Sequence, residues 1–68
     1  MAERKLGNHL KELRATKDLT QSDLALLAGV SRKTINTVEN GVFVPSTVLA
    51  LALASALDVT VQDIFFLN

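Results

Sequence analysis

Hydrophobic residues recur along this chain at helical spacing. Leu6, Leu10 and Leu13 lie at positions i, i+4 and i+7, which predicts a first amphipathic helix over about residues 3–16. No run alternates hydrophobic and polar residues regularly enough to predict a strand. The pattern therefore favours an all-α protein.

Cap signals divide the rest of the chain into four more short helices. Residues that favour helix starts are Thr20, Ser31, the pair Pro45–Ser46, and Thr60. Asp23 and Asp63 stand three places after two of these starts, as in a capping box. Gly29 and Gly41 can adopt the left-handed conformation that stops the second and third helices. The fifth helix is expected to reach about Phe66, giving a compact five-helix fold.

Only "GVS" (residues 29–31) separates the second helix from the third. Two helices joined by so tight a turn cross steeply, as in a helix-turn-helix, here over about residues 20–40. The small side chain of Ala25 then lets the third helix pass close to the second. Ile35 and Val38 point inward from the third helix, so its opposite face is expected to be exposed.

That opposite face collects the polar side chains Arg32, Lys33, Asn36 and Thr37. Arginine and lysine donate to guanine O6 and N7, and asparagine pairs with adenine N6 and N7 in the major groove of DNA. Shorter or neutral donors near the helix ends suit phosphate oxygens: Gln21, Ser31, Thr34 and Asn40. The third helix is therefore predicted to contact double-stranded DNA. Taken singly, each of these residues could also be an ordinary solvated residue.

Composition and charge limit the other classes of function. The 68 residues suit one domain over residues 1–68, and there is no cysteine, one histidine and no catalytic constellation. We therefore expect no enzyme, no metal site and no cofactor. Neither a signal peptide nor the ~20 apolar residues of a membrane span is evident, which favours the cytoplasm. The net charge is zero, yet all seven Lys and Arg residues fall between Arg4 and Lys33.

The C-terminal part, about residues 46–68, is more apolar than five short helices can bury. The fourth helix is apolar or small nearly all round, a pattern typical of cover on both sides. We expect a homodimer through this region, with Phe65 in the core of each chain. The residues assigned to the interface are Val48, Ala52, Phe66 and Leu67. The alternative is that the alanines merely form helix and the phenylalanines fill the core.

The segment "LTQSDLALLAGVSRKTINTVENG", followed by "PS" and "LDVTVQDIF", resembles the lambda-repressor-like helix-turn-helix family of the Cro/repressor or xenobiotic-response-element type. The resemblance extends from about residue 6 to residue 65. Members of this family are sequence-specific DNA-binding regulators that usually act as dimers on palindromic operators. The resemblance implies the same four base contacts and phosphate contacts for Gln21 and Asn40. It also implies that Arg14 pairs with Glu39 as part of the scaffold.

Some positions depart from the family pattern. The stretch "VFV" at residues 42–44 replaces a frequent lysine, Leu26 occupies a commonly polar position, and Asp58 replaces a frequent glycine. We predict a dimeric transcriptional regulator that represses by occupying a short palindromic operator. The alternative is a protein-interaction module, such as the antitoxin of a toxin–antitoxin pair, whose fourth helix covers a second protein.

Overall fold

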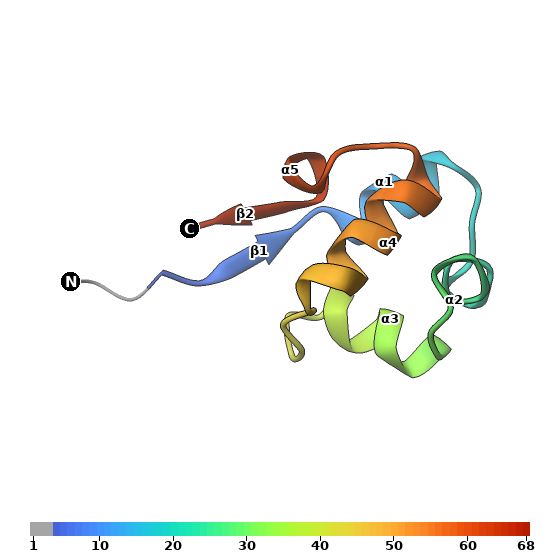
Figure 1. Ribbon diagram of the computed structural model, residues 1–68, viewed down its shortest axis with the longest axis horizontal. Helices are drawn as coiled ribbons and strands as arrows, with labels where there is room; N and C mark the ends of the chain where they lie inside the picture. Colours follow the sequence, from blue (N-terminus) through green and yellow to red (C-terminus); the bar gives the residue numbers. More distant parts are fainter. Residues whose placement is uncertain (1–3) are drawn as a thin grey trace.

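The computed structural model describes residues 4–68 as five helices and one small antiparallel sheet (Figure 1). The helices are α1 (Leu10–Thr16), α2 (Gln21–Ala28), α3 (Arg32–Glu39), α4 (Thr47–Leu57) and α5 (Val61–Ile64), and the strands are β1 (Leu6–Asn8) and β2 (Phe65–Leu67). The helices pack into one cluster, and the sheet of β1 and β2 projects from its side (Figure 1). The all-α, five-helix architecture is confirmed, and the sheet is a minor addition to it.

The predicted caps begin α2, α3, α4 and α5 as expected. The Thr20 hydroxyl accepts from the Asp23 backbone N–H, while the Asp23 carboxylate accepts from the Thr20 N–H, which completes a capping box on α2. Thr60 and Asp63 form the same arrangement on α5. Ser31 and Ser46 cap α3 and α4 through their side chains. Each cap satisfies backbone donors that a helix start leaves without partners.

The predicted start of the first helix is wrong. Helix α1 begins at Leu10, and residues 6–8 form strand β1 instead; residue 3 lies outside the described part of the chain. The physical reason is that Leu6 packs against the apolar core from a strand, so its burial does not require the helix that its spacing predicts. Glycine at position 7 permits this pairing, because a side chain there would collide with the ring of Phe66 on β2.

Two further predictions are wrong: that the last helix reaches about Phe66, and that the chain contains no strand. Helix α5 ends at Ile64, and Phe65–Leu67 continue as β2, paired antiparallel with β1 in the register Leu6↔Leu67. Each strand is only three residues long, too short for a periodic signal in the sequence. The pairing also involves residues about 60 positions apart, so only the folded chain brings the two segments together.

One apolar core joins all five helices. Its fully or nearly fully buried members are Leu10, Leu24, Ala25, Ile35, Val38, Leu49, Leu53, Ala54, Leu57, Ile64 and Phe65. Phe65 is buried as expected, with 9% of its surface exposed. Helix α4 buries one face in this core, whereas Val48 and Leu51 on its other side are 79% and 57% exposed. The single chain therefore covers α4 on one side only.

Asp58 ends α4 in the left-handed region, with φ +57° and ψ +45°. Its backbone N–H donates to Ser55 O, and the next N–H donates to Ala54 O, so the last carbonyls of the helix are satisfied. A glycine would adopt this conformation without the steric cost that a Cβ brings. Aspartate is among the residues that tolerate it best, which explains how the departure from the family pattern is accommodated.

Candidate nucleic-acid interface

The turn between α2 and α3 fixes how the third helix lies on the molecule. Gly29 adopts φ +74°, and the Val30 N–H then donates to Ala25 O at 3.0 Å, which closes the turn back onto α2. Ile35 and Val38 on α3 are fully or almost fully buried. With that face anchored in the core, the opposite face of α3 is necessarily directed to solvent.

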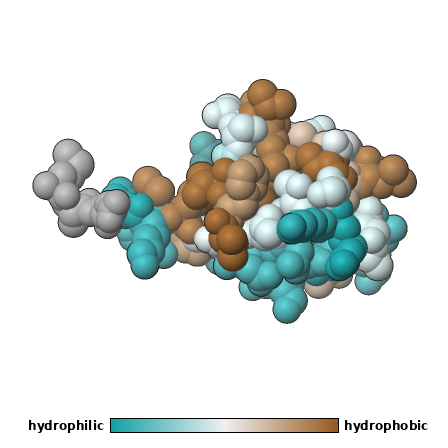
Figure 2. Space-filling model, turned by 90° about the horizontal axis from the view of Figure 1, so that it is seen from below, coloured by the Kyte–Doolittle hydropathy of each residue, from teal (hydrophilic) through white to brown (hydrophobic). Residues whose placement is uncertain are grey.

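The exposed face of α3 carries the four side chains predicted to contact bases. Arg32, Lys33 and Asn36 are exposed, and Thr37 is half-buried. The hydroxyl of Thr37 donates to the Thr34 carbonyl at 3.0 Å within the helix, so its hydrogen is already used there. Seen from the α3 side of the molecule, this area is a hydrophilic surface flanked by hydrophobic patches (Figure 2).

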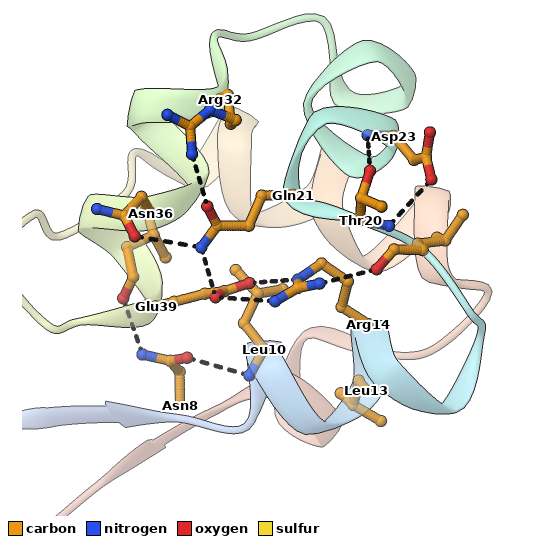
Figure 3. Close-up of polar contacts among 12 residues, drawn as sticks. Asn8, Leu10, Leu13, Arg14, Thr20, Gln21, Asp23, Arg32, Asn36 and Glu39 are labelled. Atoms are coloured by element: carbon orange, nitrogen blue, oxygen red, sulfur yellow. Dashed lines mark hydrogen bonds and ion pairs between the residues drawn. The ribbon is translucent and has the colours of Figure 1, made fainter.

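Gln21, the first residue of α2, connects this face to the scaffold (Figure 3). Its side-chain Nε2 lies 3.2 Å from Asn36 Oδ1 and 3.0 Å from Glu39 Oε1, and donates to both. Its Oε1 accepts a long hydrogen bond of 3.4 Å from Arg32 Nη1. Gln21 therefore restrains two of the side chains that are predicted to contact bases, Arg32 and Asn36.

Arg14 on α1 and Glu39 on α3 form the pair that the family resemblance implied. Arg14 Nε and Nη2 donate to the two carboxylate oxygens at 2.7 and 3.3 Å, and Nη1 donates to Leu19 O at 2.8 Å (Figure 3). The hydrogen bonds that Arg14 donates to Glu39 raise the pKa of Arg14, burial opposes this rise, and the Coulombic attraction of Glu39 adds to it. Only 15% of the Arg14 side chain and 4% of the Glu39 side chain are exposed. The pair thus fixes α3 against α1 and leaves no free cation there for DNA.

The predicted phosphate contacts lie at the two ends of α3 and the start of α2. Ser31 accepts from the Thr34 N–H as the helix cap, and the two hydroxyls are also 3.0 Å apart. At the other end, Asn40 Nδ2 donates to Asn36 Oδ1 at 3.3 Å. These side chains are exposed or partly exposed.

The four residues assigned to a dimer interface occupy two different places. Val48 and Ala52 line a groove between α3 and α4, together with Phe43 from the connecting loop. Phe66 and Leu67 instead lie on β2, where the Phe66 ring stacks on His9 with 4.7 Å between ring centroids. Phe66 is thus partly covered within its own chain and is 38% exposed.

Asn8 is a polar residue at this site that the sequence analysis missed. Its Nδ2 donates to Val38 O at 3.0 Å, near the end of α3, and its Oδ1 accepts from the Leu10 N–H at 3.0 Å (Figure 3). The predicted first helix over residues 3–16 places Asn8 in its interior, where it would have no such role. An asparagine two places before an apolar helical repeat was the available signal for a cap.

Comparisons with known proteins agree with this geometry. Residues 10–64 match the model of the HTH_3 helix-turn-helix family. An uncharacterized HTH-type transcriptional regulator of Methanocaldococcus jannaschii is 48% identical over 60 residues, which is 88% of this chain and 91% of that protein. The antitoxin PezA of Streptococcus pneumoniae is 37% identical over 59 residues, 87% of this chain but only 37% of the antitoxin.

A solved structure shows the same arrangement of helices. The restriction-modification controller protein C.AhdI from Aeromonas hydrophila superimposes with a TM-score of 0.77 at 42% sequence identity, covering 79% of this chain and 82% of that one. Among residues 4–68, no helix is long and apolar enough to cross a membrane. The match to the family model, the close relatives and the shared structure together show that this chain belongs to the lambda-repressor-like helix-turn-helix family of HTH-type transcriptional regulators.

Proposed function

We propose that this protein is a homodimeric, sequence-specific DNA-binding regulator that acts as a repressor, with α3 as its recognition helix in the major groove. The observation that carries the proposal is the exposed polar face of α3, held in place by a buried apolar face and by the Arg14–Glu39 pair. It would act by binding, without catalysis, in the cytoplasm. Occupying an operator that overlaps a promoter would exclude the polymerase.

In the proposed complex, the exposed polar face divides between two kinds of contact. Arg32, Lys33 and Asn36 contact base edges, with Thr37 in support through its methyl group. Gln21, Ser31, Thr34 and Asn40 position the protein on the phosphates. The start of α2 adds the partial positive charge of a helix N-terminus close to the phosphate backbone of the DNA. Gln21 is well placed to exchange its bond with Arg32 for a phosphate, which would release the guanidinium toward a base.

The exposed apolar surface supports a second copy of the chain as the partner. Residues 41–57 contain no charged side chain, and Val42, Val44 and Val48 are 78%, 69% and 79% exposed. A two-fold contact sets the same patch against itself, so a patch without charge avoids facing like charges across the axis. A standard interface needs about 800 Å² from each partner. The chain exposes 4664 Å² in all, so such an interface would take about a sixth of it.

A two-fold dimer also fits the DNA geometry. Two recognition helices about 34 Å apart would enter successive major grooves on one side of the duplex, and the half-sites would form a palindrome. The patch around Val48 adjoins α3, since Val48 shares a groove with Lys33 and Thr37. Pairing there would fix the position of one recognition helix relative to the other.

The test is to let the wild-type protein select duplexes from a random pool and then to determine the mass of the complex by sedimentation. The proposal predicts an enriched palindrome bound by two chains. Val48→Lys should give a folded monomer with weakened operator binding, because it places a charge in the apolar contact. Leu26→Lys is the matched control: Leu26 is 84% exposed on α2, and the same substitution there should leave the dimer intact. No enrichment, or one chain per site, would refute the proposal.

A role as an antitoxin is the second candidate, supported by the similarity to PezA and by the exposed apolar residues of α4. In that case a different protein would cover the uncharged surface. Sedimentation of the pure chain separates the two candidates. A stable dimer at low micromolar concentration favours the homodimeric regulator. A monomer that does not select DNA favours the partner protein.

A further inference from the structure

We propose that Asn8 is a positioning residue for DNA recognition: its side-chain amide fixes the C-terminal end of α3 to the terminal sheet. This inference rests on the proposed function of α3 as the recognition helix. Asn8 itself makes no contact with DNA in the proposal. Its effect is exerted through the orientation of α3 on the body of the protein.

The bonds of Asn8 define its orientation without ambiguity. The Leu10 backbone N–H is a donor, so the oxygen of the Asn8 amide must face it, at 3.0 Å. The nitrogen then faces the Val38 carbonyl, which is an acceptor, also at 3.0 Å. An amide offers a donor and an acceptor on separate atoms, and here each is used. The side chain thus satisfies the first backbone N–H of α1 and holds the end of α3 at the same time.

The backbone of Asn8 is itself held in place by the terminal sheet. Asn8 pairs with Phe65 in the two-stranded sheet, and the next residue, His9, donates its N–H to Ile64 O at 2.7 Å. The guanidinium of Arg4 donates to Leu67 O and Asn68 O, at the far end of the same sheet. Residues 4–8 and 64–68 therefore form one hydrogen-bonded unit, and Asn8 joins this unit to α3 by a hydrogen bond.

The bond from Asn8 reaches the last turn of α3. The last carbonyls of a helix have no partner within it, and Val38 O accepts from Gly41 N–H as well as from Asn8. Within residues 4–68, the bond from Asn8 is the one hydrogen bond that joins β1 to α3. Glu39, the next residue, is held by Arg14 on α1. Together the two contacts restrain the end of α3 toward α1 and toward the sheet.

Base contacts are sensitive to such restraints, because several side chains must meet a rigid set of base edges at once. A recognition site works when its groups stay within about 0.5 Å of the productive geometry. A phosphate contact made by a flexible side chain tolerates more movement, since it carries no sequence information. Loss of the restraint should therefore lower affinity for the specific sequence more than affinity for random DNA.

Asn8→Asp separates the two functions of the side chain. Aspartate at position 8 can still accept from the Leu10 N–H, and it suits helix starts as well as asparagine does. It cannot donate to Val38 O, and it places a carboxylate oxygen against that carbonyl oxygen. Thr60→Ala is the matched control, because it removes a cap of similar strength from α5 and leaves the Asn8 bonds in place. Should Asn8→Asp not fold, Asn8→Ser keeps a capping hydroxyl and lacks the amide nitrogen.

The experiment measures binding by fluorescence anisotropy to the duplex that the wild type selects from a random pool, and to a scrambled duplex. For Asn8→Asp we expect a two- to tenfold loss, about the value of one hydrogen bond, on the selected duplex only. Amide hydrogen exchange should also speed up at Gly41 and Val42, at the end of α3. Thr60→Ala should change neither the ratio of the two affinities nor this exchange.

Two results are distinguishable. If Asn8→Asp keeps the wild-type ratio of affinities, Asn8 is only a helix cap and the inference is overturned, while the proposed function stands. If the wild type itself does not discriminate between the duplexes, the proposed function fails, and the positioning role of Asn8 fails with it.

Discussion

Replacing Glu39 with glutamine tests how α3 is held on the protein. The Glu39 carboxylate accepts three hydrogen bonds, two from Arg14 and one from Gln21. A carboxylate is an acceptor only, and all three partners are donors. The amide of glutamine is almost the same shape, yet it must turn its NH₂ group toward one of these donors. Glu39→Gln therefore leaves at least one donor unpaired and removes the charge that balances Arg14.

The size of the effect follows from the burial of the pair. Breaking a fully buried ion pair costs about 3–5 kcal/mol. Here 15% of the Arg14 side chain reaches solvent, and Arg14 keeps its bond to Leu19 O. We therefore expect a loss of about 2–3 kcal/mol in the free energy of unfolding, which stays below the fully buried case. For a domain of this size, such a loss lowers the Tm by roughly 10–20 °C.

Thermal unfolding followed by circular dichroism at fixed protein concentration measures this loss. Glu12→Gln is the matched control, because it makes the same chemical change at an exposed position on α1 and should alter stability by less than about 0.5 kcal/mol. Adding Arg14→Met to Glu39→Gln should restore part of the loss, since it removes the unbalanced charge. A Tm for Glu39→Gln equal to that of Glu12→Gln would refute the claim that this pair fixes α3.

Three further predictions concern single positions or pairs. Lys33→Ala should cost about 1–3 kcal/mol of binding energy on the selected duplex and nothing on random DNA in anisotropy titrations; equal weakening on both would reassign Lys33 to the phosphates. Asp58→Gly should raise stability in urea unfolding by about 0.5 kcal/mol, because glycine relieves the left-handed backbone at φ +57°; a lower midpoint would contradict this. The backbone N–H of each cap residue holds the pKa of Asp23 and Asp63 below its ordinary value. Because the pKa of each carboxyl group is lower in the folded protein than in the unfolded chain, the ionised carboxylate stabilises the folded state. This stabilisation is complete at pH values above the unfolded pKa of about 3.9, and it is lost as the pH falls through the folded pKa. The Tm should therefore drop in acid below about pH 4, and the acid loss should be smaller in Asp23→Asn/Asp63→Asn; identical acid profiles would contradict the assignment.

The sequence predicted the parts of the fold that depend on local signals. The helix starts at Thr20 and Thr60 follow from side chains that bond to backbone groups three residues away. The turn at Gly29 follows from a conformation that glycine adopts most easily. Such interactions need only a few neighbouring residues, so a short stretch of sequence is enough to predict them.

The terminal sheet and the role of Asn8 could not be predicted in the same way. The strands depend on residues about 60 positions apart, and three-residue strands leave no periodic pattern. Leu6 fitted the helical repeat because a helix and a strand can bring it to the same core. A helix predicted over residues 3–16 makes Asn8 an interior position. Predicting the bond to Val38, 30 residues away, requires the positions of both β1 and α3.

The central claim is that the exposed face of α3 reads a DNA sequence. The most direct test is a fluorescence anisotropy titration of the wild-type protein against its selected duplex and a scrambled duplex over a series of salt concentrations. We predict binding to the selected duplex tighter by on the order of a thousandfold, with both affinities falling as salt rises. Equal and weak binding to the two duplexes at every salt concentration would contradict the claim.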